Sequence, residues 1–345
     1  MASMAAIYIV KTELEALGSE IVAHSFQAES HNALYYLGET EPALLRREAF
    51  ATVRPLRFQR QGGVLGKQRS IRAALMPVVS DLKAAKRDFS GILIHLPKLS
   101  STRTNYIINF LRFHFPGVHL RVRLIPHGTV NFSLQSMTWK KKLTLWRRWA
   151  VPFNGFFPDL RYYIPAGDWV GGLDSLVDRV YVLPGASSPY PETKLFPLPP
   201  LNDYLPGASS RRSGSIALIV GQPALRARAL DQAGHDRISA VIKRWLMEQG
   251  VSEIYYSRHP RARDHLDFFD ESYRILEQAG AIETLLPAIG PGFVVSCFST
   301  ALFTSRMVLG DGARVVSIGM NQANFPGQSE LLENMRACGI EIVDA

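Results

Sequence analysis

Two histidines lie where acid–base chemistry is expected, each at the end of an apolar run that has the length of a buried strand. His127 lies in Leu-Ile-Pro-His-Gly (124–128), and His259 lies in Arg-His-Pro (258–260). An imidazole titrates near neutral pH, so it can take a proton from a hydroxyl or stabilise an anion. We therefore predict that each histidine is an acid–base group; the alternative is that it is a structural residue of a turn.

A pair of hydroxyl residues, Ser299 and Thr300, follows the apolar run FVVSCF and opens a segment with helical spacing. Peptide N–H groups at a helix N-terminus, together with two hydroxyls, favour an anion such as phosphate, although an ordinary N-cap is the alternative. Gly221 and Gln222 end another apolar run, SIALIV. If these runs are neighbouring parallel strands, these residues and His259 meet at one sheet edge and form a phosphate pocket.

The elements that must position these residues alternate in type along the chain. AAIYIV (5–10) is followed by the helix-like TELEALGSEIVAH, and SIALIV (215–220) is followed by DRISAVIKRWLMEQG (236–250). This alternation predicts parallel sheets with helices on both faces. The segment GGVLGKQRS (62–70) lacks the glycine spacing of a P-loop, and we interpret it as a flexible loop.

One long interruption of this pattern indicates a domain boundary. The segment 192–215 is rich in proline, glycine and serine, which break regular structure. We therefore expect an α/β protein of GT-B-like architecture, with two Rossmann-like doubly wound domains facing a central cleft. The expected parts are an N-terminal domain over 1–195, a linker over 196–214 and a C-terminal domain over 215–345; the family resemblance given below implies an acceptor role for the first domain and a donor-binding role for the last.

The composition narrows the class of partner. The formal net charge of +9 indicates an anionic partner, but no RNP aromatic pattern or C2H2 spacing is present, so nucleic acid is not expected. Two cysteines are too few for a disulfide framework, and no metal-binding motif is present. The start does not resemble a secretory signal, and no run reaches the roughly 18 apolar residues of a membrane span. We expect a cytoplasmic protein or one on a membrane surface.

Basic residues and tryptophans are interleaved in the segment TWKKKLTLWRRW (138–149). This composition suits an anionic membrane surface or an acidic glycan acceptor. The alternative is a solvated helix whose tryptophans pack into the core. The basic residues are Lys140, Lys141, Lys142, Arg147 and Arg148, and the aromatic ones are Trp139, Trp146 and Trp149.

The order of these motifs resembles that of bacterial sialyltransferases and polysialyltransferases of GT-B fold. That family has an acidic turn, then a His-Pro motif, then a Ser/Thr pair. This chain has Pro126-His127-Gly128, His259-Pro260 and Ser299-Thr300 in the same order. The stretch IETLLPAIGPGFVVSCFSTALF (282–303) resembles the donor-site segment of the family. The resemblance covers the second domain well and the first domain at this one turn.

The resemblance implies an inverting, metal-independent transfer of a sialic acid or related nonulosonic acid from a CMP-activated donor, with no further cofactor. By this resemblance, His259 would contact the CMP phosphate and stabilise or protonate it as it leaves. Ser299 and Thr300 would bind the same phosphate, and Glu283 would hold the ribose hydroxyls. The donor site would be completed by the positions Gly221, Gln222 and Pro260.

The chain departs from the family at the first motif. The family has a carboxylate there as the base that deprotonates the acceptor hydroxyl, whereas this chain has Pro126 and His127. Either His127 acts as the base or the base lies elsewhere.

The resemblance also implies a glycan acceptor, which a lipid would carry in capsule or lipopolysaccharide synthesis at the inner face of the cytoplasmic membrane. Two alternatives stay open. One is the same fold with CMP-Kdo or a UDP-sugar as the donor. The other is a non-catalytic glycan- or lipid-binding protein.

Overall fold

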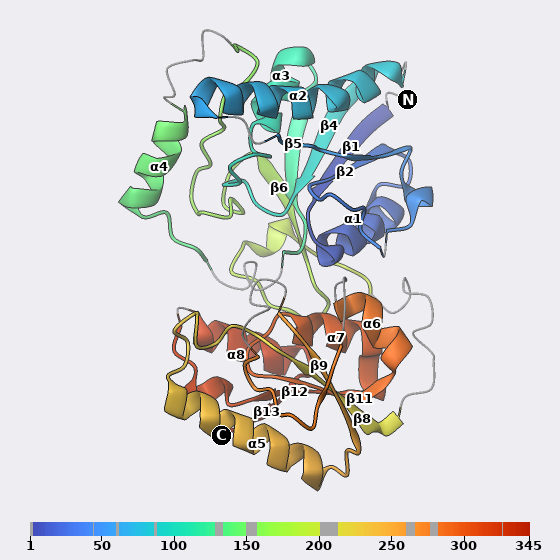
Figure 1. The fold of residues 1–345 in the computed structure, drawn as a ribbon. Coiled ribbons are helices and arrows are strands. Elements are labelled where there is room, and N and C mark those ends of the chain that lie inside the picture. Colours follow the sequence, from blue (N-terminus) through green and yellow to red (C-terminus); the bar gives the residue numbers. More distant parts are fainter. Residues whose placement is uncertain are drawn as a thin grey trace. The chain divides into compact units, whose positions relative to one another are not determined.

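The computed structural model describes residues 3–43, 45–59, 62–85, 88–127, 134–149, 157–200, 213–259, 266–276, 282–325 and 327–345. Its internal contacts divide the chain into two compact units, drawn in Figure 1. Unit 1 comprises Met1–Val182 and Ser188–Leu198, and unit 2 comprises Leu183–Ser187 and Pro199–Ala345. Each unit contains its own parallel sheet.

Unit 1 has a seven-stranded sheet in the order β3-β2-β1-β4-β5-β6-β7, with every neighbouring pair parallel. One face of this sheet packs against α2 and α3 in a large apolar core, and α1 lies on the other side. The strands are β1 (Ser3–Val10), β2 (His31–Tyr36), β3 (Thr52–Pro55), β4 (Phe89–Leu96), β5 (His119–Leu124), β6 (Val177–Val182) and β7 (Leu195–Pro197), and the helices are α1 (Glu13–Phe26), α2 (Gly63–Ala84), α3 (Ile107–His114) and α4 (Trp139–Trp149).

Unit 2 has a six-stranded sheet in the order β10-β9-β8-β11-β12-β13, again with parallel neighbours. The strands are β8 (Ser213–Val220), β9 (Glu253–Ser257), β10 (Arg274–Ile275), β11 (Pro291–Ser296), β12 (Arg314–Ile318) and β13 (Glu341–Val343), and the helices are α5 (Gln232–Glu248), α6 (Ile282–Ile289), α7 (Ala301–Leu309) and α8 (Gln328–Ala337). Short 3-10 helices lie at Arg47–Ala49, Glu192–Lys194, Gly310–Gly312 and Met320–Gln322.

Local sequence signals account for the ends of the main helices. The Thr12 side chain caps α1, and the Asp231 carboxylate accepts the Gly234 N–H at 2.8 Å at the start of α5. Gly250, at φ +71°, follows the end of α5, where a left-handed residue is needed and glycine adopts it without strain. None of the described helices is long and apolar enough to cross a membrane.

Two parallel-sheet α/β domains are present, as the alternation of strands and helices predicted. The prediction of a loop over 62–70 is wrong, because α2 begins at Gly63. Three glycines in the segment obscured its helical character, yet Gln68 and Ser70 are buried and the Ser70 hydroxyl bonds to Gln59 O at 2.9 Å.

The boundary between the units is less simple than one linker. β7 pairs with β6 in the sheet of unit 1, so the first residues of the expected linker 196–214 form a strand edge. Residues 201–212 lie outside the described part of the chain. The short segment Leu183–Ser187 packs with unit 2 although it precedes β7. The expected central cleft stays a prediction.

Candidate functional site

The carboxyl ends of three adjacent strands in unit 2 gather most of the predicted donor-site residues. β9, β8 and β11 are neighbours in the sheet. Gly221 follows β8, His259 comes two residues after β9, and Ser299-Thr300 lies between β11 and α7. The carboxyl edge of a parallel sheet is where such folds bind ligands.

Gln222 ties two of these strand ends together. It is buried, and its Oε1 accepts hydrogen bonds from Ser296 Oγ at 2.7 Å and from Phe298 N–H at 3.0 Å. The Nε2 of Gln222 is buried as well and has no hydrogen-bond partner within the described residues. Because an unmade hydrogen bond of a buried donor is costly, this amide is a candidate ligand contact beside the turn that leads to Ser299.

Ser299 and Thr300 have different roles at the start of α7. The Ser299 hydroxyl oxygen accepts the Ala301 N–H at 3.2 Å, which is the capping arrangement given as the alternative. Among the described residues its own O–H has no acceptor, so it stays available as a donor. Thr300 has helical dihedral angles and makes no side-chain cap. The N–H groups of Leu302 and Phe303 already bond to the carbonyls of Ser299 and Thr300. Among the described residues of this turn, the donors left for an anion are the hydroxyls and the N–H groups of Ser299 and Thr300 themselves.

Gly221 has a packing reason to be a glycine. A Cβ at this position would lie 2.2 Å from Tyr256 Oη and 3.0 Å from Ser257 O. Real Cβ atoms do not approach oxygen so closely, so any side chain here would displace the neighbouring β9. The close approach of the strands accounts for this glycine, whether or not a nucleotide binds.

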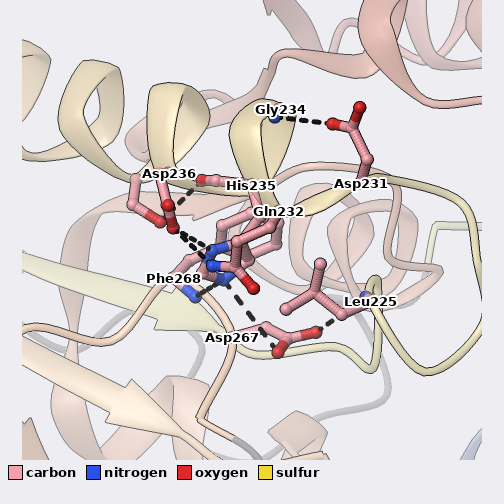
Figure 2. A network of polar contacts seen from close by, with 9 residues as sticks. Leu225, Asp231, Gln232, Gly234, His235, Asp236, Asp267 and Phe268 are labelled. Carbon is pink, nitrogen blue, oxygen red and sulfur yellow. Dashed lines mark hydrogen bonds and ion pairs between the residues drawn. The ribbon is translucent and has the colours of Figure 1, made fainter.

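A polar network connects the start of α5 to Asp267 and Phe268 (Figure 2). His235 Nε2 accepts the Phe268 N–H at 3.2 Å, which requires the proton of the neutral ring to be on Nδ1, where it reaches Asp236 Oδ1 at 3.0 Å. Tyr256 Oη donates to Asp267 O at 2.8 Å. His235 was not among the residues predicted from the sequence, where its one signal is its place one turn after the Asp231 cap.

The structure describes three of the predicted donor-site residues only in part or not at all. His259 is partly buried at the end of β9. Pro260 lies outside the described residues, and so does the side chain of Glu283, whose backbone is part of α6. Across the described residues, no group of three or more His, Cys, Asp or Glu side chains is arranged to hold a metal ion.

In unit 1, His127 is paired with a carboxylate that the sequence analysis missed. His127 Nδ1 lies 2.5 Å from Glu15 Oε1. Glu15 is fully buried, and its Oε2 accepts the Lys11 N–H at 2.6 Å. A carboxylate beside Nδ1 holds the proton of a neutral imidazole there, so Nε2 has the lone pair. The His127 side chain is 25% exposed, so this dyad can accept a proton from a hydroxyl.

The packing of α1 explains why the two residues meet. A Cβ on Gly18 would lie 3.3 Å from Pro126 Cδ, so Pro126 rests on the helix at a residue without a side chain. Glu15 precedes Gly18 by one helical turn and thus lies on the same face. Its one sequence signal is the Thr12-x-x-Glu15 spacing, which predicts a capping pair rather than a site.

The basic-aromatic segment forms α4, and its tryptophans are not part of the core. Trp139, Trp146 and Trp149 are 69%, 55% and 44% exposed, so the alternative of core tryptophans is wrong. Lys141 and Arg148 donate hydrogen bonds to residues of unit 1 outside the helix. The other three basic residues, Lys140, Lys142 and Arg147, are exposed.

Comparison with known proteins shows the fold. No family model matches the chain, and no curated protein matches it either. Among solved structures, the chain is similar to the glycosyltransferase of kitacinnamycin, with 13% identity, a TM-score of 0.51 and coverage of 100% of this chain and 87% of that one. It is also similar to a UDP-N-acetylglucosamine 2-epimerase, with 12% identity, a TM-score of 0.52 and coverage of 96% and 82%.

A third structure is the Methanocaldococcus jannaschii UDP-GlcNAc 2-epimerase in complex with UDP-GlcNAc and UDP, with 12% identity, a TM-score of 0.50 and coverage of 99% and 89%. Likeness at this level of identity is a likeness of fold. The chain therefore has the glycosyltransferase-like GT-B fold, with two Rossmann-like parallel-sheet domains.

Proposed function

We propose that this protein is an inverting glycosyltransferase that moves a sialic acid or related nonulosonic acid from a CMP-activated donor to a glycan hydroxyl. The observation that carries the proposal is the edge of unit 2, where three adjacent strand ends present Gly221-Gln222, His259 and Ser299-Thr300. The GT-B fold and the family-like order of the motifs support it.

Unit 2 would bind the donor. The hydroxyls of Ser299 and Thr300 and the Nε2 of Gln222 are hydrogen-bond donors suited to a phosphate, and His259 would stabilise or protonate that phosphate as CMP leaves. Pro260 would hold His259 in its turn, and Glu283 would bind the ribose. Hydrogen-bond donors of this kind can stabilise a leaving phosphate without a metal ion. The proposed transfer is therefore metal-independent.

Unit 1 would supply the base. His127 Nε2 would take the proton from the acceptor hydroxyl while the hydroxyl oxygen attacks the anomeric carbon of the donor. The bond between that carbon and the phosphate oxygen of CMP would break in the same step. Glu15 would hold the proton on Nδ1 and stabilise the imidazolium that forms. A carboxylate is therefore near this turn, as in the family, but it comes from α1 and acts through the histidine.

Nucleotide binding tests the donor. In thermal unfolding with CMP, CDP, UDP and GDP, we expect CMP to raise the Tm most. Thr300→Val should weaken CMP binding by about fivefold to tenfold, the value of one hydrogen bond. Thr144→Val, the same change on α4, should leave CMP binding unchanged.

The other outcomes separate the alternatives. A shift with UDP alone would indicate a UDP-sugar as the donor in place of the CMP-sugar; the epimerase structure of this fold is in complex with UDP-GlcNAc and UDP. No shift with any nucleotide would indicate a non-catalytic glycan- or lipid-binding protein. If CMP binds, transfer assays with CMP-Neu5Ac and CMP-Kdo identify the sugar.

A further inference from the structure

Helix α4 presents an apolar ridge to solvent. Residues spaced by three, four or seven positions lie on one face of a helix, and Trp139, Leu143 and Trp146 have this spacing. Trp139 is 69% exposed and Trp146 is 55% exposed. Trp149 adjoins Trp146 and is 44% exposed. Large apolar side chains gathered on one exposed face indicate an interaction surface.

The opposite face attaches α4 to unit 1. Leu145 is its buried residue. Lys141 Nζ donates to Ser136 O at 3.0 Å and lies 5.3 Å from the centre of the Trp169 ring. Arg148 Nη1 donates to Tyr162 Oη at 3.3 Å. The helix is thus anchored through two of its five basic residues, and its ridge faces away from the core.

The remaining basic residues flank the ridge. At 100° per residue, Lys142 lies on one side of the Trp139–Trp146 line, and Lys140 and Arg147 lie on the other. All three side chains are exposed, and α4 has no acidic residue. The surface is therefore complementary to a partner that is both apolar and anionic.

We propose that α4 binds the surface of an anionic lipid bilayer, with its axis in the membrane plane. The tryptophans would enter the boundary between headgroups and acyl chains, and Lys140, Lys142 and Arg147 would meet the lipid phosphates. An interfacial helix needs this arrangement of an apolar ridge between cations. The inference depends on α4 alone and does not require the proposed donor.

Sedimentation of the full chain with vesicles tests the proposal. We expect salt-sensitive binding to vesicles of phosphatidylcholine with phosphatidylglycerol and much weaker binding to phosphatidylcholine alone. Lys140→Gln/Lys142→Gln/Arg147→Gln should lower the partition coefficient by about a hundredfold, since each basic residue near the surface contributes about fivefold. Trp139→Ala/Trp146→Ala should also lose binding, together with the blue shift of tryptophan fluorescence on vesicles.

A matched control removes an exposed apolar and an exposed basic side chain from another helix. Arg244→Gln/Met247→Ala changes the exposed face of α5, where Met247 is 61% exposed, and should bind vesicles like the parent chain. The Tm of each variant, with and without CMP, shows that it is folded and tests donor binding separately.

Two results would overturn the proposal. One is equal vesicle binding by the parent chain and the α4 variants. The other is binding of a soluble acidic polysaccharide that needs the α4 residues while vesicles are not bound, which would make α4 an acceptor surface.

Discussion

At the residue scale, the pairing of Glu15 with His127 changes what a missing carboxylate means. The sequence pattern predicted that His127 lies in a turn at the end of a strand, which is β5, but left the role of the histidine open. The structure adds a buried acid that is 112 residues away in the chain and reaches the ring at 2.5 Å. No local pattern could have revealed the pair, because it depends on α1 packing beneath Pro126 at Gly18.

Removal of the imidazole should abolish most of the turnover. We expect His127→Ala to lower kcat by about 10²- to 10⁴-fold, the range for loss of a general base, while the CMP-induced rise in Tm persists. Steady-state transfer kinetics with donor and acceptor check this. Turnover close to that of the parent chain would remove His127 from the mechanism.

Glu15 should act as a positioning residue. Glu15→Gln keeps one acceptor oxygen, which can still accept the Lys11 N–H, but presents an amide NH2 to the ring in place of Oε1. It therefore removes both the acceptor that holds the proton on Nδ1 and the charge that stabilises an imidazolium. We expect kcat to fall by about a hundredfold or more, with the KM for the donor and the Tm nearly unchanged. A fall in Tm large enough to account for the lost activity would contradict this role. So would a recovery of activity when Glu15→Gln is added to His127→Ala.

At the scale of elements, the strands and helices that hold the site could largely be predicted, but their close contacts could not. The runs at 5–10 and 215–220 are strands as expected, and the pattern from FVVSCF into ALFTSRMVL is strand and helix. The exposed side of α4 was left open, because exposed and buried tryptophans leave the same pattern in a sequence.

Gly221 provides an element-scale prediction. Gly221→Ala should lower the free energy of unfolding by about 1–3 kcal/mol, since its Cβ would meet Tyr256 Oη at 2.2 Å. Gly214→Ala, within the strand β8 that precedes Gly221, has open space around its Cβ and should change stability by less than about 0.5 kcal/mol.

Chemical denaturation measures both variants. Tyr256→Phe, added to Gly221→Ala, removes the hydroxyl that the Cβ meets and should recover part of the loss. Equal stability of the two alanine variants would mean that β8 and β9 have room to separate.

At the scale of the whole molecule, a buried histidine couples the stability of unit 1 to pH. Burial first, and then the nearby Arg123 guanidinium, holds the pKa of His95 well below its usual 6.5. His95 lies in β4 and stacks on Tyr8 at 4.2 Å between ring centres. The unfolded chain takes up a proton at His95 as pH falls through about 6.5, and the folded chain does not.

Stability should therefore be complete above about pH 6.5 and decrease below it, by up to about 1.4 kcal/mol per pH unit from this residue. Denaturation at pH 7.5, 6.5 and 5.5 measures the slope. His95→Gln should make the slope shallower by that amount. An identical slope in the variant would assign the acid sensitivity to other groups.

The order of the two units along the chain could be predicted, but the path between them could not. The proline-rich segment marks the final passage to unit 2. The earlier visit by Leu183–Ser187 also contains turn-forming residues, Pro184 and Gly185, but these do not distinguish a turn from a passage between units. The passage depends on Ser187, whose N–H and hydroxyl bond to Asn334 Oδ1 at 2.8 and 3.0 Å.

This path limits how the protein can recombine. The chain enters unit 2, returns to unit 1 to form β7, and leaves again after Leu198. A chimaera joined at that last crossing would bring a foreign unit 2 against the native Leu183–Ser187 segment, which would find no Asn334 of its own. Exchange of unit 2 between proteins with this chain path therefore requires two matched changes, one on each side of β7.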